Sequence, residues 1–375
     1  MVTRLPSNRT MPPATFPMFV LPAARILTLK RLPKHEEIRD ELVEWTEEKT
    51  TLFVSQTWLS YAHPDNESNS KLSYLQHFLR EAASGSMTIH CAMDGEAMGF
   101  AKQIRLTPEK TKTIAWVWFD IFSVPQNDSV NQGKAISSLP AYVANSAFFL
   151  VLAGAWEHEN GSVRDYRAWY RRGWCRLEQL SNALGPKPKQ IILMQSRSDI
   201  IAYGAMGITG YNWLLSGVGD GQFTVEADRA ALGPVVLALI NERMAARRAE
   251  GSEEGWRWYR MLHALKPTLL SGMPDQEPPI APLEAWLEHL GYASATERDS
   301  IGLAPLRYAT VSTPQHYNSC CLYTLPVYRS LRDIHTHTNL VLADRRACRP
   351  CDSAARARFG SRRAAHGQRS RIVLL

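Results

Sequence analysis

The stretch that decides the fold is Trp174-Cys175-Arg176-Leu177-Glu178, which is entered through Arg171-Arg172-Gly173. The run 147–152 (Ala-Phe-Phe-Leu-Val-Leu) lies upstream of it and has the composition of a buried strand. The Trp-Cys pair begins a predicted helix, and Glu178 follows Trp174 by one helical turn, so both side chains lie on one face. A buried strand, a loop and a helix that carries an aromatic ring beside an acid predict either a site or ordinary packing.

The same alternation of apolar strands and helices extends over residues 51–195. Strands are predicted at 51–55, 114–120, 148–152 and 190–194, with helices between them. This pattern is typical of parallel strands whose sheet is covered by helices on both faces. Such sheets bind ligands at the carboxyl ends of their strands. We therefore expect Asp120, the loop at Pro125 and the start of the Trp174 helix at that edge.

Composition and charge describe a globular body with a basic end. Hydrophobic residues make up 45% and charged residues 21% of the chain, and no run reaches the roughly 18 apolar residues that span a bilayer. The net charge of +7 originates in residues 329–375, which hold 11 Arg and 3 Asp. This basic end favours a disordered, solvated segment over a nucleic-acid contact. Six cysteines without a secreted disulfide pattern indicate a reducing compartment and a cytoplasmic location.

The order of these features predicts five segments. They are a disordered leader (1–34), an α/β domain (35–250), a helical connector (251–296), a short repeat-like fragment (297–312) and a disordered Arg-rich tail (313–375). A transit peptide in the leader is disfavoured by its prolines. At the start of the α/β domain, Ile38, Leu42 and Trp45 have the spacing of an amphipathic helix over 35–48.

Several of these motifs together resemble a known family. Three strands and one helix follow the order found in the Toll/interleukin-1 receptor (TIR) domain. They are the strand Phe53-Val54-Ser55, the strand Trp118-Phe119-Asp120, the strand 149–152 and the helix Trp174-Cys175-x-x-Glu178. The segment 118–126 (WFDIFSVPQ) is also similar to heterokaryon-incompatibility domains. The resemblance covers roughly 51–195 and implies a TIR/flavodoxin-like parallel sheet with helices on both faces.

The resemblance also implies a site. In enzymatic TIR domains the Glu of this helix cleaves the nicotinamide–ribose bond of NAD, which assigns catalysis to Glu178. The candidate ligand contacts, chosen by their positions in the strands, first loop and helix, are Ser55, Trp58, Asp120 and Trp174. The first loop, which holds Trp58, departs from the family pattern. A carboxylate beside the ribose can stabilise the oxocarbenium character of the transition state. NAD is then the substrate, and no separate cofactor is required.

Each of these residues also has a structural interpretation. Glu178 is alternatively a surface acid that pairs with Arg171 or Arg172. Trp174 is alternatively a packing residue at the start of its helix, and Asp120 is alternatively a cap for the loop that follows it. The segment His63-Pro64-Asp65 is pocket-lining or a turn. The segment 156–170 is longer and more charged than in the family, so it could cap or block the site.

Two further motifs lie near the C-terminus. Residues 299–309 (DSIGLAPLRYA) resemble the opening of an ankyrin repeat, but a single unit cannot bury its faces. A truncated or frame-shifted gene end would explain why the array stops. The C-terminal segment also holds residue types that bind zinc, namely His335, His337, Cys348 and Cys351, with Cys320-Cys321 upstream. Their spacing matches no standard zinc finger, so no metal site is expected.

The sequence therefore supports two functional hypotheses. The first is an intracellular TIR-like signalling or assembly module that self-associates or binds protein partners through the Pro125-Gln126 loop, without a membrane span. The alternative is an NAD glycohydrolase with Glu178 as its catalytic carboxylate. Nucleic-acid binding by the Arg-rich tail is the least supported, and whether the chain is an enzyme depends on Glu178.

Overall fold

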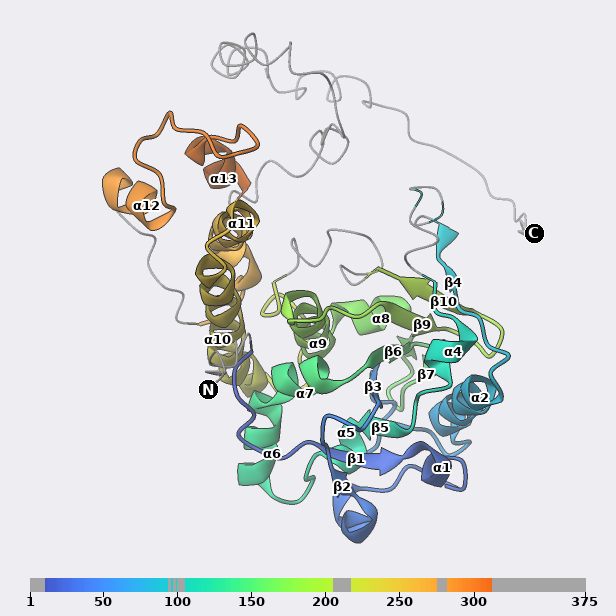
Figure 1. Cartoon of the computed structure of the whole chain (residues 1–375). Coiled ribbons are helices and arrows are strands. Elements are labelled where there is room, and N and C mark those ends of the chain that lie inside the picture. Colours follow the sequence, from blue (N-terminus) through green and yellow to red (C-terminus); the bar gives the residue numbers. More distant parts are fainter. Residues whose placement is uncertain are drawn as a thin grey trace, which may run out of the picture. The chain divides into compact units, whose positions relative to one another are not determined.

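The predicted apolar strands lie side by side at the centre of a sheet (Figure 1). The computed structural model describes residues 11–93, 96, 99, 105–204, 217–274 and 282–311. The central strands are parallel in the order β5 (Trp116–Phe119), β3 (Thr51–Gln56), β6 (Phe148–Leu152) and β9 (Ile191–Met194). In chain order this arrangement is second, first, third and fourth, so the strand order reverses between β3 and β6. The prediction of a mostly parallel α/β sheet is confirmed.

Further strands extend both edges, so this sheet has eight strands in the described part of the chain. On one edge β1 (Phe19–Pro22) pairs antiparallel with β5, and β2 (Val43–Glu44) pairs antiparallel with β1. On the other edge β10 (Ile200–Tyr203) pairs antiparallel with β9, and β4 (His90–Cys91) runs parallel to β10. Both edge strands, β2 and β4, are only two residues long, so little backbone is left unpaired at either edge.

The N-terminal segment corrects two expectations. Residues 19–26 of the expected disordered leader form β1 and the short helix α1 (Ala23–Ile26), because pairing with β5 fully buries Val20 and Leu21. Residues 1–10 lie outside the described part. The helix expected over 35–48 is replaced by two single turns, η1 (His35–Glu37) and η2 (Arg39–Glu41), followed by β2. Ile38 and Leu42 are buried nonetheless.

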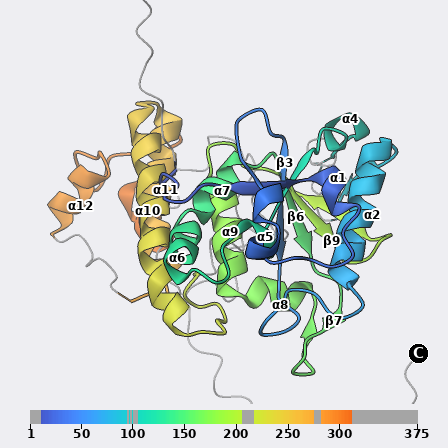
Figure 2. The ribbon, with the colours of Figure 1, turned by 90° about the horizontal axis from the view of Figure 1, so that it is seen from below.

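Helices cover both faces of the sheet (Figure 2). Phe53 points to one face, where α7 (Leu139–Asn145) and α9 (Gly173–Leu184) contact β3. Two further helices, α10 (Ala227–Ala249) and α11 (Glu253–Leu269), belong to the same hydrophobic core, and α10 packs against α9. Leu52 and Val54 point to the other face, beneath α2 (Ser70–Ser84). Strand side chains alternate between faces, so each central strand contributes to both cores. The remaining elements are α4 (Pro108–Thr111), α5 (Asp120–Ser123), α6 (Ser129–Ser137), the hairpin β7 (Trp156–Glu157) and β8 (Val163–Arg164), and α8 (Tyr166–Arg171).

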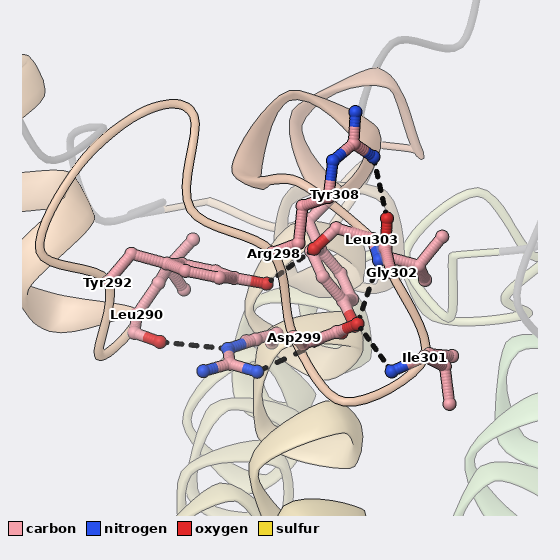
Figure 3. A network of polar contacts seen from close by, with 9 residues as sticks. Leu290, Tyr292, Arg298, Asp299, Ile301, Gly302, Leu303 and Tyr308 are labelled. Carbon is pink, nitrogen blue, oxygen red and sulfur yellow. Dashed lines mark hydrogen bonds and ion pairs between the residues drawn. The ribbon is translucent and has the colours of Figure 1, made fainter. Parts of the chain in front are cut away.

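After the sheet the described chain is helical. The long helix α10 packs against α9 and α11, and α12 (Leu283–His289) and α13 (Pro305–Val311) follow. Asp299 fixes the turn before α13 by accepting hydrogen bonds from the amides of Ile301 (3.1 Å) and Leu303 (2.8 Å) and from the Tyr308 hydroxyl (2.7 Å) (Figure 3). No helix in the described ranges is long and apolar enough to cross a bilayer.

Candidate functional site

The candidate site lies at the carboxyl end of β3, between β5 and β6. β3 and β6 are the first and third central strands, and in this topology the chain leaves neighbouring strands toward opposite faces at that position. Ser55 and Gln56 are the last residues of β3. Because side chains alternate along a strand, they leave its end on opposite faces. The site therefore has two halves, one on the α9 side and one on the α2 side.

The α9 half is a directed chain of hydrogen bonds. The indole Nε1 of Trp169 on α8 donates to the Ser55 hydroxyl oxygen at 2.7 Å, and the Ser55 hydroxyl donates to Oε2 of Glu178. An indole can only donate, so it occupies the acceptor side of Ser55 and leaves the hydroxyl proton for Glu178. Oε1 of Glu178 has no hydrogen-bond partner among the described residues. One oxygen of Glu178 is thus fixed and the other is available to a ligand.

The environment of Glu178 favours its neutral form. Burial raises the pKa of Glu178 to about 8, the Ser55 hydrogen bond opposes that rise, and the nearby Asp120 adds to it. The side chain is half-buried and keeps some contact with solvent. The expected ion pair with Arg171 or Arg172 is not formed, since the carboxyl group turns toward β3 instead.

The α2 half is centred on Asp120. Nε1 of Trp58 donates to Asp120 Oδ2 at 2.7 Å, and the Gln56 amide donates to Oδ1 (3.1 Å) and Oδ2 (3.0 Å). The Ile121 amide also donates to Oδ1, at 2.8 Å, so Asp120 caps the following turn as well. Burial raises the pKa of Asp120, and these hydrogen bonds counteract the rise.

The buried amine of Lys71 holds the Gln56 side chain in this half of the site. Lys71 on α2 is fully buried, and its Nζ donates to Oε1 of Gln56 and to the carbonyl of Thr57. Lys71 thereby turns the Gln56 amide group toward Asp120, since Oε1 of Gln56 is held by the amine. Burial lowers the pKa of Lys71 to about 7, against the opposing charges of Asp65 and Asp120.

Cys175 joins the two halves but is not a nucleophile. Its thiol lies 3.6 Å from the carbonyl oxygen of Gln56 and is buried. Burial raises the pKa of the thiol well above its ordinary value, and Glu178 adds to this. A neutral, buried thiol is unreactive.

The predicted site residues are only partly brought together. Ser55 meets Glu178, and Trp58 meets Asp120, as described above. Trp174 points away from both, because its Nε1 donates to Asp228 at the start of α10 at 3.2 Å. Asp65 ends a turn and accepts hydrogen bonds from the amides of Lys71 and Leu72, each at 2.9 Å, at the start of α2. Asp65 therefore stabilises the start of α2.

Sequence reasoning missed Trp169, Gln56 and Lys71. Trp169 lies in the segment 156–170, which has no periodicity, so no pattern distinguishes it from the other aromatic residues there. Lys71 precedes the apolar stripe of α2, and a lysine beside such a stripe is normally solvated. Only Gln56 could have been identified from the sequence, because it directly follows Ser55 at the end of a buried strand, where ligand-binding residues are expected.

Neither a metal-ligand cluster nor either of two cavities found in the described residues lies at the candidate site. No cluster of three or more His, Cys, Asp or Glu side chains suited to a metal occurs in the described ranges. The His and Cys residues after 319 lie outside those ranges. Two cavities, of about 420 and about 500 Å³, open between α11, α12 and the Asp299 turn, with Tyr292 in both linings. They are remote in sequence from Glu178 and hold none of its partners.

The hydrogen-bond chain is testable through Ser55. In Ser55→Ala the buried Trp169 indole loses its acceptor, so we expect a loss of about 1–3 kcal/mol in the free energy of unfolding by urea denaturation. The pKa of Glu178 should rise further in this variant, because the Ser55 hydrogen bond lowers it. Carboxyl titration by ¹³C NMR measures that change. Ser129→Ala, at an exposed position, is the control. If the two variants were equally stable, the hydrogen bonds from Trp169 through Ser55 to Glu178 would not contribute to stability as proposed.

Comparison with protein-family models, with curated proteins and with solved structures finds no match to this chain. The topology alone therefore classifies it, as a mixed α/β domain with a largely parallel sheet.

Proposed function

We propose that this domain hydrolyses the nicotinamide–ribose bond of NAD, with Glu178 as the catalytic carboxylate. The observation that carries the proposal is the state of Glu178. Its Oε2 is oriented by Ser55 and Trp169, while Oε1 has no partner in the described chain, at the edge where parallel sheets bind ligands. The likeness of its motifs to TIR domains supports the same assignment.

The reaction follows from the chemistry of that carboxyl group. The bond between C1′ of the ribose and the nicotinamide nitrogen breaks, and its electron pair leaves with the nitrogen. Water adds to C1′ and releases a proton to solvent, which gives ADP-ribose and nicotinamide. Ionised Glu178 stabilises the positive charge that develops on the ribose. The cationic nicotinamide ring favours this ionised form when it binds.

The test is release of nicotinamide from NAD by the purified full chain, followed by chromatography at low and at high protein concentration. Turnover is expected in the wild type and not in Glu178→Gln. A wild type that releases no nicotinamide at any concentration would overturn the proposal.

We propose assembly as a second function, through the surface formed by Asn127 and Val130. Pro125 is buried, and the carboxylate of Glu36 accepts the amides of Gln126 (2.7 Å) and Asn127 (2.8 Å). The loop is therefore held in one conformation, which lowers the entropic cost of docking. Val130, at the start of α6, is 67% exposed beside it.

Substitution of Val130 tests the second function. Val130→Asp should weaken self-association at least about tenfold in sedimentation velocity, since a charge replaces an apolar contact at the interface. Val225→Asp is the matched control, because Val225 is also exposed (55%) but lies before α10. A wild type that stays monomeric, or two variants that behave alike, would count against this surface.

A further inference from the structure

The hairpin β7–β8 covers the carboxyl end of β3. The backbone amide of Glu159 donates to the carbonyl of Leu59 at 2.9 Å, and the Tyr61 amide donates to the Glu159 carboxylate at 3.0 Å. The Trp156 ring lies 5.7 Å from Nζ of Lys71, which itself binds the carbonyl of Thr57 just after β3. The hairpin is therefore held against the loop that follows β3 and against Lys71.

Arg164 lies on the inner face of this hairpin. It pairs directly opposite Trp156, whereas Glu157 pairs opposite Val163. Opposite residues of an antiparallel pair share a face, so Arg164 is on the side of Trp156 and Lys71. The exposure of the four side chains is consistent with this pairing. Glu157 and Val163 are exposed, whereas Trp156 and Arg164 are half-buried.

Arg164 has no counter-ion among the described residues. Its Nε is buried and has no hydrogen-bond acceptor in that part of the chain. Within the described ranges no carboxylate lies in ion-pair distance of Arg164, and the adjacent Asp165 is used to cap α8 through the Ala168 amide at 2.9 Å. A buried cationic donor that lacks both an acceptor and a counter-charge is costly, so a missing partner is expected.

A second cation, Arg172, lies at the entry to the helix that carries Glu178. Arg172 immediately precedes α9, and its guanidinium binds only the neutral hydroxyl of Thr224, at 2.9 Å, among described residues. Burial lowers the pKa of Arg164, and the positive charge of Arg172 lowers it further. The amino-terminal end of α9 contributes further positive potential at this point.

We propose that Arg164 and Arg172 form a phosphate-binding subsite that holds the diphosphate of a nucleotide whose ribose reaches Glu178. The assignment of the ribose rests on the proposed function, whereas the diphosphate is assigned by the arginines alone. Arginine suits this task because its planar donors match phosphate oxygens.

Calorimetric titration with ADP-ribose tests the subsite. We expect Arg164→Gln to raise the Kd at least about tenfold, since one charged contact to a phosphate is lost. Arg167→Gln removes an exposed arginine three residues further on and should leave the Kd unchanged. Adenosine, which lacks phosphate, should bind the wild type and Arg164→Gln equally weakly.

Three results would overturn the inference. They are an unchanged Kd in Arg164→Gln, an equal effect of Arg164→Gln on adenosine, and no ADP-ribose binding to the wild type. Because the titration measures binding without turnover, it is independent of hydrolysis. Binding that depends on Arg164 in a chain that releases no nicotinamide would retain the subsite and refute the hydrolase.

Discussion

Replacing Glu178 with glutamine is expected to abolish nicotinamide release and to leave the fold intact. Glutamine keeps the size of the side chain and its acceptor oxygen for the Ser55 hydroxyl, but it cannot ionise. Loss of a carboxylate that acts on the transition state typically lowers the rate by about 10²- to 10⁴-fold. Glu157→Gln, on the exposed face of β7, is the same substitution outside the site and should retain full activity.

The pH dependence of the wild type checks the same role independently. The ionised carboxylate is the active form, and the pKa of Glu178 is raised to about 8. The value of kcat/KM should therefore rise with pH up to about 8 and level off above it, because kcat/KM reports the free enzyme. A profile that is flat from pH 6 to 9 would contradict Glu178 as the catalytic carboxylate.

Stability should show the opposite trend. Between the ordinary pKa of 4.5 and the raised value of about 8, the folded protein keeps the proton of Glu178 while the unfolded chain loses it. The free energy of unfolding therefore falls as pH rises through this window. Glu178→Gln removes that dependence and should be more stable than the wild type at pH 8.5 by roughly 1–3 kcal/mol, less than the full shift because water screens the half-exposed group. Urea denaturation at pH 5 and pH 8.5 measures the difference.

The central sheet was predictable because its signals are local. Runs such as Phe148–Leu152 are apolar without alternation, which only a strand buried on both faces requires. The strand β1, which lies next to the edge strand β2, was not predictable in the same way. Its apolar patch is short and flanked by prolines, and it becomes a strand only because β5 offers an unpaired edge almost a hundred residues away.

The sequence placed Glu178 and Ser55 in one candidate site, and the structure brings the two side chains into contact. The residues that pack around this contact were not predictable from motifs. The indole at Ser55 belongs to Trp169 rather than Trp174, although both precede Glu178 on adjacent helices. The choice depends on the bend between α8 and α9, where Arg172 is extended, and one-dimensional spacing does not encode that bend.

The largest effect on stability is expected from Asp299→Ala. The Asp299 side chain is fully buried, and besides its three hydrogen bonds it faces Nη1 of Arg260 at 3.9 Å. Removal of one partner from a buried ion pair costs about 3–5 kcal/mol, because the other charge stays buried without compensation. Tyr308, which is 5% exposed, would also lose the acceptor of its hydroxyl.

The loss should be local to the turn and α13. The Arg260 guanidinium is otherwise held by the Leu290 carbonyl (2.9 Å) and by the Tyr292 ring, 4.1 Å away, so residues 290–308 depend on one another. Hydrogen exchange in Asp299→Ala should therefore quicken over 297–311 and stay unchanged in β3 and β6. Asp40→Ala, at an exposed acid, should alter neither region.

Asp299→Asn separates the charge of Asp299 from its hydrogen bonds. Asparagine keeps one oxygen for the amides of Ile301 and Leu303 but provides no counter-charge for Arg260. We therefore expect protection between that of the wild type and that of Asp299→Ala. If asparagine behaved like aspartate, the ion pair at 3.9 Å would contribute nothing, and the hydrogen bonds alone would hold the turn. Unchanged exchange in Asp299→Ala would contradict both contributions, because Arg260 would then be stable without either.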